Sequence, residues 1–314
     1  MNSPSGSSAA DAANNHKAGL IYAITAYVLW GLLPVFFLSL MPAGAIEIVA
    51  WRVVFSLLFC VAILTVTRTW PKLVAIAKQP RLLLLLGLAA ALILVNWIVY
   101  VFATLSGHVV EGSLGYFINP LVTVLLGVFI LREKLRPAQW VAVGIAAVAV
   151  LVLAIGYGQF PWISLVLAFS FGFYGFVKKW VGPRVDAVSG LTLETAWLIP
   201  AAVVMLWIVS LGDGIVFGTA GLGNTLLLIS AGVVTAVPLL LFAASSRRLP
   251  LVWLGLTQFL APVLQFAFGA FVMGEPMPLE RWAGFLLVWI ALVVLMSDMV
   301  IRGRAARRAS PLPG

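Results

Sequence analysis

The sequence predicts an all-α polytopic membrane protein with ten transmembrane helices, arranged as two inverted five-helix repeats. Three observations predict this fold: the composition, the spacing of apolar windows and an internal duplication. Of the 314 residues, 63% are hydrophobic and only 9% are charged, whereas soluble domains have about 45–50% and about 25%. The chain is therefore expected to lie in a lipid bilayer.

Apolar windows long enough to cross a membrane recur along the whole chain. A helix needs about 20 apolar residues to cross a hydrocarbon core about 30 Å thick. Ten such windows, bounded by charged or turn residues, occur here. They extend over residues 19–38, 46–67, 82–105, 113–131, 140–155, 162–177, 190–211, 225–244, 251–273 and 282–300.

Basic residues alternate along these windows. Lys and Arg follow the even-numbered windows and are absent after the odd-numbered ones, except for Arg281 at the start of the tenth. Because loops rich in Lys and Arg are retained in the cytoplasm, we expect both termini to be cytoplasmic. The net charge of +9 is then topological, lies beside anionic lipid headgroups and requires no nucleic-acid partner.

An internal duplication relates the two halves of the chain. Pro120 and Trp140 recur 142 residues later as Pro262 and Trp282, with glutamates at positions 133 and 275 in the same register. Each copy holds five windows, an odd number, so the second copy enters the bilayer from the opposite side. Inverted repeats of this kind are typical of secondary transporters.

The duplication predicts four parts of the chain. Residues 1–18 have no apolar periodicity and are expected to form a disordered cytoplasmic tail. The expected five-helix repeats cover residues 19–156 and 162–300, and residues 301–314 form a basic cytoplasmic tail.

Several segments carry a resemblance to a known family. Residues 113–120 read SLGYFINP, and supporting segments are AYVLWGLLP at 26–34, LETAWLIP at 193–200 and VTAVPLL at 234–240. This pattern resembles the RarD permeases, a branch of the EamA-like drug/metabolite transporter (DMT) superfamily. The resemblance implies two inverted halves around a central cavity in a bacterial cytoplasmic membrane. It also implies export of small organic metabolites or drugs, with chloramphenicol as a candidate substrate.

Ionisable residues inside the apolar windows are the first site candidates, because a charge at the bilayer centre costs about 2.5–3.5 kcal/mol. Arg52 lies about six residues into the second window. It can pair with an anionic substrate group or with Glu47, or it can snorkel outward and bind backbone carbonyls. Glu47 is five residues away, a spacing that strains an ion pair within one helix. Glu47 and Glu194 are related by the repeat and are candidate gating or proton-coupling groups; helix capping at the interface is the alternative.

Polar and aromatic residues near the expected cavity complete the predicted substrate site. Asn96 lies in the middle of the third window and either bridges helices or meets the substrate; a cavity role is favoured because Asn119 offers a second amide. Proline frees the carbonyl four residues earlier, so broken helices are expected near Pro120 and Pro262, with packing kinks as the alternative. The substrate-binding candidates besides Arg52 are Asn96, Trp97, Tyr100, Tyr116, Asn119 and Gln258, and the hinge candidates are Pro120, Pro238 and Pro262.

The remaining polar residues predict no chemistry. His108 and Glu111 are expected to be solvated loop residues, Glu133 and Glu275 to organise turns, Asp298 to be interfacial and Cys60 to be an inert thiol. We expect no metal, no cofactor and no catalytic group, since no zinc motif, membrane aspartate pair or Walker loop occurs. A secondary transporter is the leading hypothesis, with a lipid flippase or a non-transporting membrane sensor as alternatives. Glu47 and Glu194 motivate proton coupling as one form of it, and the coupling ion is left open. The oligomeric state is left open.

Overall fold

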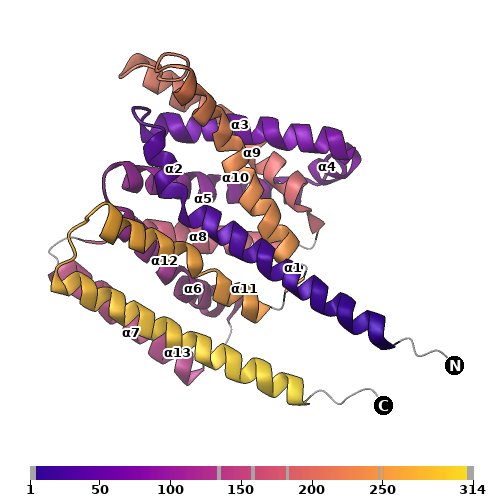
Figure 1. The fold of residues 1–314 in the computed structure, drawn as a ribbon, viewed down its shortest axis with the longest axis vertical. Helices are drawn as coiled ribbons and strands as arrows, with labels where there is room; N and C mark the ends of the chain where they lie inside the picture. Colours follow the sequence, from indigo (N-terminus) through magenta and orange to yellow (C-terminus); the bar gives the residue numbers. More distant parts are fainter. Residues whose placement is uncertain are drawn as a thin grey trace.

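The computed structural model describes residues 5–132, 136–156, 160–181, 184–246, 248–249 and 251–309, and within these ranges it is all-helical. Glu133, expected to organise a turn, lies outside the described residues. Helices cover all ten predicted windows (Figure 1). They are α1 Ser5–Gly31, α2 Leu33–Ser39, α3 Ala45–Thr67, α4 Trp70–Ala77, α5 Pro80–Leu105, α6 Val109–Leu131, α7 Pro137–Gly156, α8 Trp162–Val181, α9 Ala187–Leu211, α10 Leu222–Ser246, α11 Leu251–Thr257, α12 Leu260–Ala267, the π-helical η2 Phe268–Val272 and α13 Leu279–Ala309.

Seven of these helices are long and apolar enough to cross a membrane: α3, α5, α6, α7, α9, α10 and α13. An eighth span results if α1 and α2, which bend by 41° at their junction, cross the membrane as one unit. The chain is therefore a multi-pass membrane protein, as predicted. Helix α8 falls outside this set, and α11, α12 and η2 divide the ninth window into short pieces.

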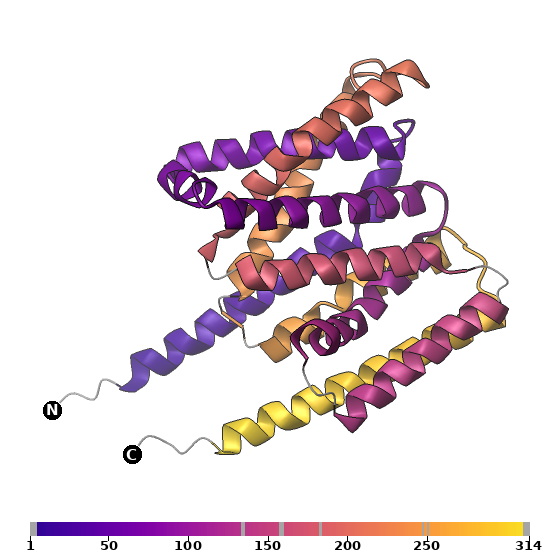
Figure 2. The ribbon, with the colours of Figure 1, turned by 180° about the vertical axis from the view of Figure 1, so that it is seen from behind.

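The helices form one bundle with two main apolar cores. One core joins α2, α3, α5, α8 and α9, and the other joins α6, α7, α12 and α13. Helices α7 and α13 lie side by side along one edge, as both views show (Figures 1 and 2). The start of α1, the end of α13 and α4 lie at one end of the bundle, and the connection between α9 and α10 lies at the opposite end.

Glycines allow the closest helix contacts. A Cβ atom at Gly232 of α10 would lie 2.3 Å from the backbone oxygen of Phe55 in α3, and one at Gly115 of α6 would lie 2.7 Å from that of Ser164 in α8. Small residues at such crossings are typical of membrane helices, where close backbone approach replaces hydrophobic burial as the source of packing energy.

Four features differ from the sequence-based expectations. The structure places residues 5–18 in α1 instead of a disordered tail, where alanines favour helix, and it extends α13 to Ala309 in the expected basic tail. Helix α4 lies in the basic loop after the second window. Helix α6 continues without interruption through Pro120, so the expected break is wrong there.

Two other prolines behave differently from each other. Pro238 also lies inside an unbroken helix, α10. The expected break is present only near Pro262, because the turn at Gln258 and Phe259 separates α11 from α12. Pro262 has no N–H to donate to the Gln258 carbonyl, which weakens the helix at this point.

Candidate functional site

Arg52 of α3 is the centre of a buried polar cluster. Its side chain is almost fully buried, with 5% of its surface exposed. The Nε atom donates a hydrogen bond of 2.6 Å to the hydroxyl of Thr235 in α10. The guanidinium carbon lies 4.2 Å from the ring centre of Trp97 and 5.5 Å from that of Phe37. Cation–π contact and one hydrogen bond therefore hold this charge inside the bundle.

Asn96 of α5 bridges three helices. Its Nδ2 donates to the Leu167 carbonyl at 3.2 Å and to the Ser170 hydroxyl at 3.1 Å, both in α8. Its Oδ1 accepts a hydrogen bond of 2.9 Å from the Tyr116 hydroxyl of α6. Of the two predicted roles, helix bridging is the one that the geometry describes, since a buried amide is stable only when its groups are paired.

Two neighbouring polar atoms lack hydrogen-bond partners in the described part of the chain. These are the hydroxyl of Tyr100 and Oδ1 of Asn119, both buried. The Tyr100 ring contacts the rings of Phe37 and Tyr116 edge-on, at 6.1 Å and 5.4 Å between centres. Unpaired groups are costly in a membrane interior unless water or a bound molecule satisfies them.

The structure divides the predicted substrate residues into two groups. One group is linked by hydrogen bonds, ring contacts or electrostatic interactions, and consists of Arg52, Trp97, Tyr100, Tyr116 and Asn96. Asn119 lies one turn beyond Tyr116 and faces α8, where a Cβ atom at Gly172 would be 3.4 Å from its Oδ1. Among the described residues, no hydrogen bond or ring contact joins Gln258 to this cluster.

Glu47 holds a loop from the other half of the chain. Its carboxylate, 1% exposed, accepts hydrogen bonds of 2.9 Å from the amides of both Val216 and Phe217, which connect α9 to α10. Trp51 donates to the same carboxylate at 3.3 Å and stacks on Phe217 at 4.2 Å between ring centres. As expected from their spacing, Glu47 and Arg52 do not form an ion pair.

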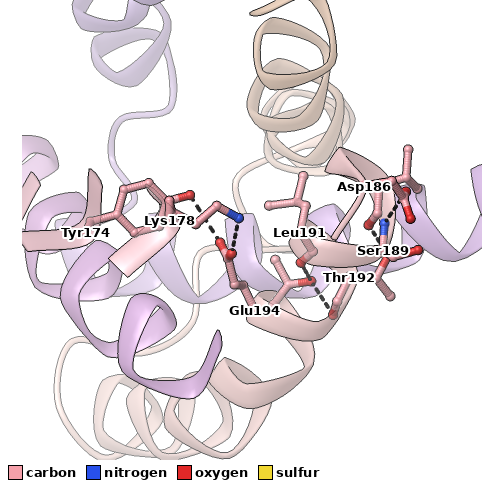
Figure 3. A network of polar contacts seen from close by, with 9 residues as sticks. Tyr174, Lys178, Asp186, Ser189, Leu191, Thr192 and Glu194 are labelled. Carbon is pink, nitrogen blue, oxygen red and sulfur yellow. Dashed lines mark hydrogen bonds and ion pairs between the residues drawn. The ribbon is translucent and has the colours of Figure 1, made fainter. Parts of the chain in front are cut away.

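Glu194 of α9 is paired within its own half. Lys178 of α8 lies 2.5 Å from Oε1, and the Tyr174 hydroxyl donates to Oε2 at 3.2 Å. Figure 3 shows both side chains pointing from α8 to Glu194. Sequence reasoning treated Lys178 only as a topological charge. The signal that could have identified it is that a buried carboxylate needs a cation on a facing helix.

Glu275 connects the two halves near the start of α6. Its Oε1 accepts hydrogen bonds of 2.6 Å from the Val109 amide and 3.1 Å from the Val110 amide. Burial raises the pKa of the Glu275 carboxyl above its ordinary value, and these amides, with Arg281 and His108, oppose the rise. The predicted turn-organising residue therefore caps a helix that lies far away in the sequence.

The other polar predictions have mixed outcomes. Glu111 lies in the first turn of α6 instead of a loop, and its carboxylate accepts from the Ile163 amide at 3.1 Å. Asp298 pairs with Arg136 at 3.0 Å. Cys60 is buried. Within the described ranges, no three His, Cys, Asp or Glu side chains gather as metal binding would need.

The fold and this buried cluster define a multi-pass membrane protein with polar groups between its helices. Residues 17–155 match the EamA-like transporter family. Protein RarD of Streptomyces exfoliatus is 50% identical over 95% of this chain and 93% of its own length. Protein RarD of Escherichia coli is 37% identical over 93% and 98%. The chain belongs to the RarD branch of the EamA-like transporter family.

Two further comparisons give another relative and a structure of similar fold. The Chloramphenicol-sensitive protein RarD of Pseudomonas aeruginosa is 33% identical over 92% of this chain and 97% of its own length. One solved crystal structure matches 88% of this chain and 96% of its own at a TM-score of 0.58 and 18% identity. That likeness concerns the fold alone.

Proposed function

We propose that this protein is a secondary transporter that exports small organic solutes through the bacterial cytoplasmic membrane by alternating access. The observation that carries the proposal is the Arg52 cluster, a charge and unpaired hydroxyl buried between helices of a transporter-family protein. Buried ionisable groups in membrane spans usually mark substrate or ion pathways. Chloramphenicol remains a candidate substrate, on the strength of the name of the Pseudomonas aeruginosa relative.

Helix contacts support two inverted five-helix repeats, covering residues 19–156 and 162–300, and hence ten spans. Such a repeat pairs α1 with α8, α3 with α9, α5 with α10, α6 with α12 and α7 with α13. Exchanging the members of each pair should leave the set of contacts unchanged. The α5–α8 contact has the counterpart α10–α1, α6–α8 has α12–α1, and α3–α10 has α9–α5. The pairs α3–α9, α6–α12 and α7–α13 contact each other directly.

The two repeat-related carboxylates support a gating role. Glu47 binds amides of the opposite half, whereas Glu194 binds Lys178 and Tyr174 of its own half. In alternating access, the contacts at the two ends of the bundle interchange between the inward-open and outward-open states. A single state should therefore show different partners for Glu47 and Glu194, as this structure does. We propose Glu47 and Glu194 as the gates, with Glu194 also the candidate for proton coupling, and Pro120, Pro238 and Pro262 as the hinge positions.

Counterflow in reconstituted vesicles tests the function. Wild-type protein should exchange chloramphenicol or a component of a soluble metabolite mixture, and Arg52→Ala should lose this exchange while remaining in the membrane. Arg68→Ala is the matched control, because Arg68 is an exposed arginine at the end of the same helix. Lipid scrambling without solute exchange would indicate a flippase, and neither activity would indicate a sensor; both outcomes contradict the proposal.

A further inference from the structure

The Arg52 guanidinium is a buried cation without a counter-ion in the described part of the chain. No carboxylate oxygen there lies within 4.0 Å of its nitrogens. The buried glutamates of the bundle already have other partners. Glu47 and Glu275 accept hydrogen bonds from backbone amides, and Glu194 pairs with Lys178. An isolated charge in a membrane interior is costly, so a partner from outside the chain is the simplest means of compensation.

The surroundings of Arg52 restrict how such a partner approaches. Trp97 covers one face of the guanidinium, and Nε is occupied by Thr235. The two terminal nitrogens make no hydrogen bond to the described residues and form a planar fork of N–H donors. A planar oxyanion that accepts two parallel hydrogen bonds matches this fork.

Neighbouring groups define the rest of the ligand. The unpaired Tyr100 hydroxyl can donate a further hydrogen bond to the same anion. The rings of Phe37, Trp97, Tyr100 and Tyr116 provide apolar walls around it. A single positive charge balances one negative charge, which favours a monoanion over a doubly charged phosphate.

We propose that the ligand of the Arg52 site is an amphipathic organic monocarboxylate. Its carboxylate binds the two terminal nitrogens of Arg52 and the Tyr100 hydroxyl, and its apolar body lies against the aromatic side chains. This inference rests on the proposed transport function and names the substrate class for it.

Ligand-dependent thermal stability in nanodiscs of neutral lipid tests the inference. The probes are 3-phenylpropionate, its neutral amide and phenyl phosphate. We expect the carboxylate to raise the melting temperature of the wild-type protein, and the amide and the phosphate to have little effect, because only a ligand that binds the folded state stabilises it. Equal effects of acid and amide, or no effect of the acid, would overturn the proposal.

Two variants separate a binding role from a structural role. Arg52→Met removes the unpaired charge, so we expect the ligand-free protein to be at least as stable as wild type while its carboxylate affinity falls about 10–100-fold. Arg52→Lys keeps the charge without the fork and should bind weakly. Arg68→Met should leave affinity unchanged. A large loss of ligand-free stability in Arg52→Met, or retained carboxylate affinity in it, would show that Arg52 is structural.

Additional measurements identify which claim fails. Stabilisation by phosphatidylglycerol but not by the carboxylate would assign the anion to a lipid headgroup and overturn the proposal. Counterflow of a neutral solute without carboxylate binding would refute the ligand class and leave transport intact. Carboxylate binding without counterflow of any solute would support the anion site and refute transport.

Discussion

Single carboxylates join segments that are far apart in the sequence. Glu47 accepts hydrogen bonds from the consecutive amides of Val216 and Phe217, and Glu275 does the same for Val109 and Val110. An amide in a buried or interfacial place that loses its acceptor keeps its desolvation cost, about 1–3 kcal/mol per group. Removing the acceptor side chain should therefore lower the free energy of unfolding by more than the net contribution of one hydrogen bond.

Replacing Glu47 with alanine should loosen the connection between α9 and α10. We expect a loss of about 2–6 kcal/mol in the free energy of unfolding, because two amides each lose their acceptor. Thermal unfolding measures the loss, and hydrogen exchange at Val216 and Phe217 should accelerate locally. Glu47→Gln keeps one acceptor oxygen and should lie between alanine and wild type.

The control for this prediction is Glu280→Ala, since Glu280 is an exposed glutamate in the first turn of α13. It should change stability little. If Glu47→Ala proves as stable as Glu280→Ala, with unchanged exchange at Val216 and Phe217, the carboxylate does not hold this loop.

At the residue level, the sequence can single out a residue that is unusual in itself, but it does not indicate which partner a residue will have. Arg52 could be selected because an arginine within an apolar window is exceptional in itself. The partners of Glu47, Glu194 and Glu275 are backbone amides or a lysine on other segments, and no local pattern indicates which segments meet. The pairing of Asn96 with Tyr116 and Ser170 also depends on how α5, α6 and α8 cross.

At the scale of elements, close helix crossings depend on single glycines. We expect Gly232→Ala to lower the free energy of unfolding by about 1–3 kcal/mol, because the new Cβ would lie 2.3 Å from the rigid backbone oxygen of Phe55. Gly144→Ala in α7 is the matched control, since a Cβ there meets no atom within 4 Å. It should be neutral or stabilising, because alanine favours helix.

Thermal unfolding of both variants in one detergent measures this difference. Equal melting temperatures for Gly232→Ala and Gly144→Ala would mean that α3 and α10 do not cross as closely as the structure has them.

Helix positions could be predicted from the sequence because each window is a long apolar run, and apolar length is what a bilayer selects. The places where a helix is interrupted could not be predicted in this way. Pro120 and Pro262 are equivalent in the duplication, yet α6 continues through one and the turn at Gln258 precedes the other. Local sequence fixes the missing N–H, whereas neighbouring helices decide whether the chain bends. Helix α4 was missed because its eight residues are too short for a spanning window.

At the scale of the whole molecule, the number of spans depends on the bent α1–α2 pair, the divided ninth window and α8, of which α8 can be tested directly. Its last turn carries Lys178 and Lys179, which lower its mean hydropathy, although long lysine side chains can reach the interface from within a span. The helices between Gln79 and Asp213 are α5, α6, α7, α8 and α9. If all five cross the bilayer, the two residues lie on opposite sides; if α8 does not cross, they lie on the same side.

Cysteine labelling from one side of the membrane therefore decides the topology. In a Cys60→Ala background, Asp213→Cys should react with an impermeant maleimide in right-side-out vesicles, because both target positions are exposed and the ten-span arrangement places Asp213 outside. Gln79→Cys should react only after permeabilisation, since the basic residues around it predict a cytoplasmic loop. Labelling of both residues before permeabilisation, or of neither, would remove α8 from the spans. The five-helix count of each half, and the inverted repeat with it, would then fail.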